Sequence, residues 1–140
     1  MAAQAEAPVY IVHMNAGGEA DMLKYARERG APVMGETCPQ YLVLDATRYD
    51  TQDFSAAKYV MSPPLREKHN QEPLWRGLQD GVIACVGSDH CSFNFAGQKE
   101  IGQSDFSRIP NGIPGVENRF GLLYSFGVAT GKISLSQFVA

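Results

Sequence analysis

Short apolar runs alternate with amphipathic segments along the first ninety residues, and this alternation is the strongest constraint on the fold. The apolar runs have no polar alternation, which is typical of strands covered on both faces. The two segments between them have helical spacing and end in glycine. Strands alternating with helices predict an α/β fold with a parallel sheet, either a small doubly wound domain or a piece of a (β/α) barrel. The expected strands are residues 8–13, 31–37 and 82–89, and the expected helices are residues 17–30 and 71–81.

Two long connections interrupt this pattern, at residues 38–70 and 90–114. The first contains Pro63 and Pro64, and the second is rich in glycine and proline, so neither is expected to form long regular elements. Connections of this length in a compact domain are commonly functional. After them the sequence predicts an amphipathic helix over residues 115–128 and the start of another at residues 134–140, with a capping box.

Composition excludes several classes of function. The chain has 140 residues, 44% of them hydrophobic and 19% charged, which predicts one globular domain with a buried core. A net charge of -3 with no basic patch argues against nucleic acid as a partner. No apolar run approaches the roughly 18 residues of a membrane span, and the first residues do not resemble a signal peptide, so a cytoplasmic protein is expected. The three widely spaced cysteines are expected to be free thiols.

Polar side chains stand where each expected strand ends. His13 ends the first, Glu36 and Thr37 end the second, and Ser88 and Asp89 end the third. Because the carboxyl ends of parallel strands are where such folds assemble their sites, His13 and Asp89 are expected to face one site. A histidine and an aspartate from different strands suit zinc or manganese, and an aspartate beside a metal-bound water can accept a proton. A hydrogen-bonded pair that only holds the strand ends together is the alternative.

Three neighbouring features are weaker candidates. His90 follows Asp89 on an extended segment and is expected to point the other way, and Cys91 is expected to be packed rather than reactive. Gly17 and Gly18 open a helix and could cradle an anion, but the other elements of a phosphate-binding motif are missing.

Six stretches together resemble one family. They are VYIVHMN, GETCPQYL, KYVMSPPLR, LWRGLQDG, GSDHCSFN and IPNGIPGVENR. Their order and spacing are similar to those of the dihydropyrimidinases and D-hydantoinases of the amidohydrolase superfamily, and the resemblance runs from about Val9 to the last residue. It implies that the chain is a fragment of a single catalytic (β/α)8 TIM barrel of the metal-dependent amidohydrolase type, comprising about strands six to eight with their helices and no second domain.

The resemblance also implies residue roles. By motif, His13 matches a metal-binding histidine, and Asp89 matches an aspartate that binds a metal and takes the proton of the bridging hydroxide. Ser62 and Asn111 match positions that hold the substrate through backbone groups. The implied reaction is hydrolytic opening of a dihydropyrimidine or hydantoin ring to an N-carbamoyl amino acid, a step of pyrimidine catabolism. The implied cofactor is a pair of divalent metal ions, with zinc favoured and manganese as the other option.

Other metal ligands of the family are missing from this sequence, among them the histidine pair of the first strand and the carboxylated lysine of the fourth. A barrel of this type needs about 250 residues, so the 140-residue chain alone is expected to be inactive. The full-length protein is expected to form a homo-oligomer, a tetramer by resemblance. A non-catalytic scaffold like the collapsin response mediator proteins is the alternative, but those relatives lack the histidine and aspartate that stand here at positions 13 and 89.

Overall fold

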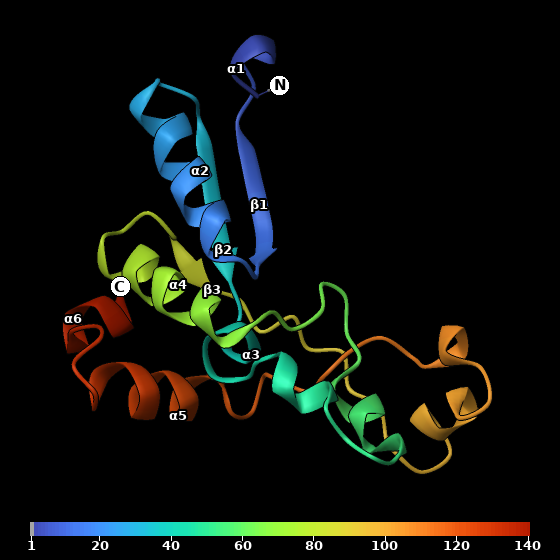
Figure 1. Cartoon of the computed structure of the whole chain (residues 1–140). Helices are drawn as coiled ribbons and strands as arrows, with labels where there is room; N and C mark the ends of the chain where they lie inside the picture. The colour runs from blue at the N-terminus through green and yellow to red at the C-terminus, as the bar shows by residue number, and fades with distance from the viewer. Residues whose placement is uncertain (1) are drawn as a thin grey trace.

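Three parallel strands form one sheet in the order β1-β2-β3. The computed structural model describes residues 2–140. Strand β1 (Val9–Met14) is followed by helix α2 (Gly17–Glu28), and β2 (Val33–Thr37) is connected to β3 (Cys85–Val86) through a long excursion that ends in helix α4 (Gln71–Gln79) (Figure 1). The predicted α/β alternation and both of its helices are confirmed. Gly30 and Gly81, placed at the ends of these helices, adopt the positive φ values of 77° and 67° expected of helix-terminating glycines.

The other helices are short. They are α1 (Ala2–Ala5), α3 (Pro39–Val43), α5 (Arg119–Leu123), which continues as a π-helical turn at Tyr124–Val128, and α6 (Leu135–Val139). The capping box predicted for α6 is present, because Ser134 and Gln137 exchange hydrogen bonds between side chain and backbone. The helix predicted over residues 115–128 begins only at Arg119. None of the helices in residues 2–140 is both long and apolar enough to cross a membrane.

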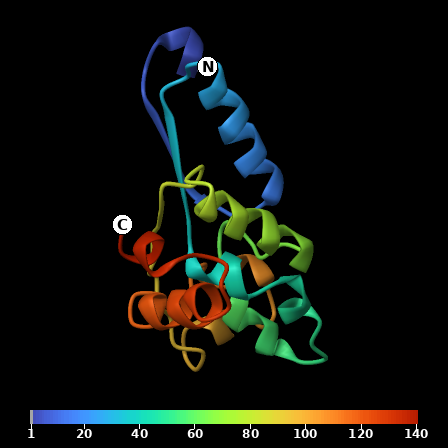
Figure 2. The ribbon, with the colours of Figure 1, turned by 90° about the vertical axis from the view of Figure 1, so that its left-hand side faces the viewer.

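Two expectations about the strands are wrong. The third strand was expected over residues 82–89 but pairs only at Cys85–Val86. The first strand was expected to be covered on both faces, yet its side chains from Val9 to Val12 are 39% to 46% exposed. Figures 1 and 2 show the reason: α2 packs beside β2, whereas β1 is an edge strand with no described helix along it. The apolar character of β1 therefore exceeds what residues 2–140 bury.

A β-bulge interrupts the pairing of β1 with β2. Ile11 pairs with Gly35 and Met14 pairs with Thr37, so three steps along β1 correspond to two steps along β2. Met14 is 1% exposed in the core, and its backbone carbonyl accepts a hydrogen bond from the Thr37 hydroxyl at 2.7 Å. The bulge thus fixes the conformation of the last residues of β1, including His13.

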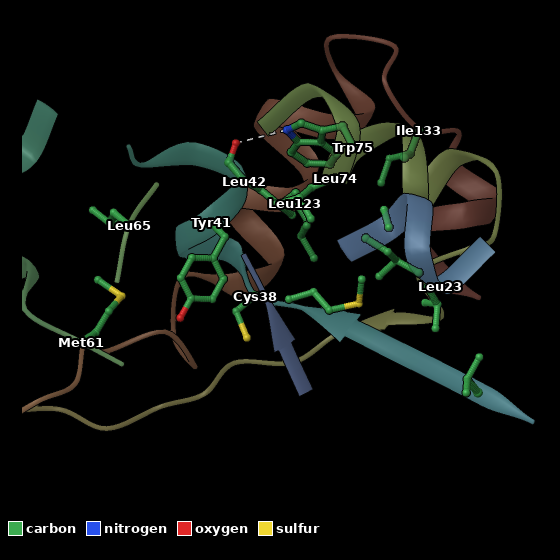
Figure 3. Close-up of a cluster of buried hydrophobic side chains, with 14 residues drawn as sticks. Leu23, Cys38, Tyr41, Leu42, Met61, Leu65, Leu74, Trp75, Leu123 and Ile133 are labelled. Carbon is green, nitrogen blue, oxygen red and sulfur yellow. Dashed lines mark hydrogen bonds between the residues drawn. The ribbon is translucent and has the colours of Figure 1, made fainter. Parts of the chain in front are cut away.

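The core lies between the sheet and helices α2, α3 and α4, with α5 against α3 (Figure 3). Leu74 and Trp75 of α4 are its centre, at 0% and 3% exposure. The indole Nε1 of Trp75 donates a hydrogen bond to the Leu42 carbonyl at 3.2 Å, which links α4 to α3. Gly127 lies directly against the indole, where an added Cβ would come within 2.7 Å of a ring carbon. This cluster holds the carboxyl end of the sheet to the helices around it.

The two long connections fold into short 3-10 turns rather than extended coil. Residues 44–70 and 90–114 meet away from the sheet, where the rings of Phe54 and Phe95 are 6.2 Å apart (Figure 1). Phe54 begins the turn Phe54–Tyr59, and Phe95 precedes the turn Lys99–Gly102. The prediction that neither connection forms long regular elements is confirmed.

Candidate functional site

His13 occupies an unusual backbone position at the end of β1. It lies in the β-bulge, has a φ of 42°, and is half-buried. A positive φ costs free energy for a residue with a side chain, and such conformations are concentrated at functional sites. Bulges next to active sites commonly redirect a side chain. The local backbone therefore gives the imidazole an orientation that regular strand geometry would not.

Asp89, three residues beyond the end of β3, also has a positive φ. Its φ is 45°, and within residues 2–140 the only other non-glycine residues with positive φ are Glu6 and His13. The backbone leads to Asp89 from Val86, which pairs with Thr37, and Gly87 N donates to the Thr37 carbonyl at 2.9 Å. Since β1 and β3 both pair in parallel with β2, His13 and Asp89 lie at the same carboxyl end of the sheet, on either side of β2.

Cys38 directly follows β2 at this end of the sheet. Cys38 is fully buried, and burial raises the pKa of its thiol to about 12, with the Asp89 and Glu36 carboxylates adding to the rise. Burial also raises the pKa of the Tyr41 phenol, with smaller contributions from Cys38 and Asp89. The Asp89 carboxylate is therefore close enough to act electrostatically on two groups at the carboxyl end of β2.

This environment predicts a difference in thiol reactivity within the 140-residue chain. Cys85 and Cys91 are exposed and Cys38 is buried, so an aromatic disulfide reagent at mildly alkaline pH should label the first two and leave Cys38 intact until the chain unfolds. We expect Cys38 to react about 100-fold more slowly, because it must wait for opening of the core. Labelling followed by peptide mass spectrometry checks this. Equal rates at all three thiols would contradict the burial of Cys38.

The same pKa gives a direction to the pH dependence of stability. Above about 9 the unfolded thiol loses its proton, whereas the folded thiol keeps it up to about 12. The folded state then binds more protons than the unfolded state, so the free energy of unfolding falls as pH rises through this window.

Hydrogen bonds bring the Ser62 segment to the carboxyl edge of the sheet. The Tyr41 hydroxyl donates to the Pro63 carbonyl at 2.9 Å, and Asn15 Nδ2 donates to the Pro64 carbonyl at 2.7 Å. The Ser62-Pro63 peptide bond is cis. Asn15 follows His13 by two residues, so this contact links the candidate metal ligand directly to the segment predicted to bind substrate.

The Asn111 segment joins the same assembly. Gly112 N donates to the Val60 carbonyl at 3.0 Å, and Cys91 N donates to the Ile113 carbonyl at 3.2 Å. Gly112 has a φ of 151°, and an added Cβ would clash with the Cys91 carbonyl oxygen, so only glycine fits there. The structure therefore places the segments of His13, Ser62, Asp89 and Asn111 in one hydrogen-bonded cluster.

The structure shows the positions of the weaker candidates. His90 Nδ1 accepts hydrogen bonds from Gly115 N at 3.1 Å and Val116 N at 3.3 Å, so it anchors the loop that follows Asn111. Cys91 is exposed, which corrects the expectation that it is packed: its backbone, not its thiol, holds the loop.

The amides at the start of α2 are already occupied. The Glu19 carboxylate accepts from Asn15 N and Ala16 N, and Asn70 Oδ1 accepts from Gly17 N. An anion cradle at these glycines is therefore not supported, because side chains of the protein take the place of the anion.

Backbone groups near Ser62 and Asn111 are available to a ligand. Both residues are exposed, and within residues 2–140 neither backbone N–H nor C=O of either residue makes a hydrogen bond to the protein. The Asn111 side chain instead donates to the Ile109 carbonyl at 3.3 Å. Free backbone donors and acceptors on two adjoining loops are suited to bind a cyclic amide, which presents both kinds of group.

The donor set at the sheet edge fits part of a metal site. His13 offers an imidazole nitrogen and Asp89 a carboxylate, which are ordinary zinc and manganese ligands. Residues 2–140 contain no group of three or more histidine, cysteine, aspartate or glutamate side chains placed to hold a metal ion. Two donors from this chain could hold a metal only together with ligands from elsewhere.

Two features went unnoticed in the sequence. On the uncovered face of the sheet the Tyr10 hydroxyl donates to the Glu36 carboxylate at 2.8 Å and lies 2.9 Å from the Cys85 sulfur, and these contacts raise the pKa of Tyr10. Lys99 is buried between the two long connections. Period-two alternation marks Tyr10 and Glu36 as facing one way, but nothing local in the sequence marks Lys99 as buried.

Comparison with known proteins shows which proteins this chain resembles. No protein-family profile matches the chain. It is 53% identical over 133 residues to a D-phenylhydantoinase from Escherichia coli and 51% identical over 131 residues to a D-hydantoinase from Geobacillus stearothermophilus, covering 95% and 94% of this chain. The chain spans 28% of the length of each of these relatives.

Solved structures agree with the sequence comparison. The crystal structure of a dihydropyrimidinase from Brevibacillus agri matches 98% of this chain with a TM-score of 0.95 and 56% identity, and a D-hydantoinase from a Bacillus species matches with a TM-score of 0.96 and 55% identity. The chain covers 30% of each of those proteins. By sequence and by fold, it belongs to the D-hydantoinase and dihydropyrimidinase family, of which it represents one segment.

Proposed function

We propose that this chain is part of a metal-dependent cyclic amidohydrolase that opens a hydantoin or dihydropyrimidine ring to an N-carbamoyl amino acid. The observation that carries the proposal is the match of nearly the whole chain, in sequence and fold, to proteins named hydantoinase and dihydropyrimidinase. The convergence of His13, Asp89 and two loops with free backbone groups at one sheet edge supports it.

The proposed metal ligands are His13 and Asp89. Divalent metal ions, zinc or manganese, would polarise the substrate carbonyl and supply hydroxide near neutral pH. Asp89 would accept the proton of the attacking hydroxide and then donate a proton to the ring nitrogen as the C–N bond breaks. Its exposure at the end of β3 leaves the carboxylate accessible for both transfers.

Ser62 and Asn111 would bind the ring through their backbone. The N–H and C=O groups of a cyclic amide need one acceptor and one donor, and both loops have such groups free. Because backbone atoms would do the binding, changes in loop shape should matter more than changes of these two side chains. Gly112, which has room for no side chain, fixes that shape beside Asn111.

The wider context of the segment is also a proposal. We infer that β1, β2 and β3 are strands six, seven and eight of a (β/α)8 barrel, and that the uncovered face of β1 looks into its interior. Closure of the barrel would bury the apolar side chains that are exposed on β1. A cytoplasmic homo-oligomer remains our expectation for the full-length protein.

Metal removal tests the function. The native polypeptide that carries this sequence, purified with zinc or manganese, should hydrolyse dihydrouracil or a hydantoin; chelation should abolish turnover, and added metal should restore it. Chromatographic assay of the N-carbamoyl product together with elemental analysis makes the measurement. The 140-residue chain alone should show no turnover above a metal-only blank, because it holds only two of the proposed ligands. Full activity in demonstrably metal-free protein, or none with metal present, would refute the proposal.

A further inference from the structure

Lys99 is a buried lysine without a carboxylate partner. It begins the turn Lys99–Gly102 and is 2% exposed. Its Nζ donates a hydrogen bond to the Val60 carbonyl at 2.7 Å. Among residues 2–140 the only ion pair joins Lys132 to Glu72, so the Lys99 ammonium has no ionic partner there. Lysine is almost never fully buried unless it is paired, which means that this position has a specific use for the amine.

The surroundings of Lys99 do not explain its burial as a source of stability. Burial lowers the pKa of the amine, and the nearest aromatic ring, that of Phe93, has its centroid 5.9 Å from Nζ. An apolar side chain of similar length would fill the same space without a desolvation cost. The feature that an apolar side chain could not supply is the hydrogen bond to Val60.

That hydrogen bond acts where the two long connections meet. The Val60 carbonyl accepts from Lys99 Nζ and also from Gly112 N at 3.0 Å. Val60 precedes Ser62 by two residues, and Gly112 directly follows Asn111. One carbonyl oxygen therefore joins the Ser62 segment, the Asn111 segment and the turn that begins at Lys99.

We propose that Lys99 is a positioning residue that holds the Ser62 and Asn111 loops in a fixed relation, so that their free backbone groups match one cyclic amide. This inference rests on the proposed function for the meaning of the two loops, and on the Val60 contacts for the role of the amine. Lys99 itself reaches neither substrate nor metal in this account; it acts through Val60.

Hydrogen exchange tests the clamp without relying on activity. In Lys99→Met, which keeps length and loses the donor, the hydrogen-bonded amides of Val60, Ile109 and Gly112 should exchange about tenfold faster, while those of β2 and α4 stay unchanged. Lys58→Met is the matched control, because Lys58 also lies at the junction of the long connections, 5.1 Å from the Phe95 ring, but is exposed. Unchanged exchange in Lys99→Met, or equal acceleration in the control, would overturn the clamp.

A second variant covers the case in which Lys99→Met unfolds the whole chain. Lys99→Gln keeps a neutral donor that is shorter than the lysine amine, so the burial cost falls while the contact with Val60 is weakened. Faster exchange confined to the same two loops would support the clamp. Exchange like that of the unaltered protein would overturn it, because the contact would then be dispensable.

Kinetics separate a positioning role from a merely structural one. In the native polypeptide, Lys99→Met should raise KM for the cyclic amide about tenfold and leave kcat within about threefold, since loop geometry governs ring binding. A small primary alkylammonium should partly restore KM in Lys99→Ala and leave Lys58→Ala unaffected. An unaltered KM alongside looser loops would refute a role in substrate positioning. If the unaltered protein opens no ring, the proposed function fails, whereas the exchange experiment still decides the clamp.

Discussion

Replacement of Asp89 by asparagine should lower kcat/KM for ring opening by about 1,000-fold in the native polypeptide. The change keeps the size of the side chain but removes the proposed anionic metal ligand, which is also the group proposed to accept and return the proton. Asparagine tolerates a positive φ better than most residues, so the 45° φ at this position should persist. The loss should therefore arise from chemistry rather than from misfolding.

Asp80→Asn is the matched control for this variant. Asp80 is an exposed carboxylate that follows α4, and its loss should leave kcat/KM within about twofold. Steady-state assays with metal content measured on the same samples would show whether lost turnover follows lost metal or lost proton transfer. An Asp89→Asn protein as active as the control would remove Asp89 from the proposed mechanism.

Truncation of Trp75 should produce the largest loss of stability in the chain. Trp75→Ala should lower the free energy of unfolding by about 3–5 kcal/mol, the range for a large aromatic removed from a packed core. The indole is 3% exposed, bonds to the Leu42 carbonyl, and lies against Gly127, so the cavity would open between α4, α3 and the turn after α5. Urea denaturation of the 140-residue chain followed by far-ultraviolet circular dichroism measures the change.

Two comparisons give this result its meaning. Trp75→Phe should cost less, about 1–2 kcal/mol, because it keeps a ring and loses mainly the hydrogen bond to Leu42. Phe106→Ala removes an aromatic ring that is 85% exposed, so it should change stability by no more than about 0.5 kcal/mol. Similar losses for Trp75→Ala and Phe106→Ala would show that the cluster around Trp75 is not the core of the chain.

The order of elements was predictable because local pattern determines it. Apolar runs and helical spacing set β1, α2, β2 and α4, and glycine ended both helices as expected. The extent of β3 was not predictable, because pairing depends on what lies beside a strand. An apolar run over residues 82–89 is compatible with a longer strand, but only two of its residues pair with β2.

The candidate site was predictable in outline and not in detail. Strand order and the position of polar residues were enough to bring His13 and Asp89 to one edge. Their roles, and those of Ser62 and Asn111, came from resemblance and stay proposals. The burial of Lys99 depends on two loops that meet across 39 positions of sequence, and no local pattern encodes such a contact. The positive φ values of His13 and Asp89 were likewise not predicted from the sequence.

The bulge in β1 also reverses the alternation of the strand. Counted strictly by twos, Met14 would share the exposed side of Tyr10 and Val12, which are each 46% exposed; instead it is 1% exposed in the core. The extra residue between Ile11 and Met14 makes this reversal. The number of residues in that interval is therefore as constrained as their identity: deletion of Val12 would leave Ile11 and Met14 two steps apart, which matches Gly35 and Thr37 in a regular ladder, so Met14 would stay in the core while the bulge that orients His13 would be lost.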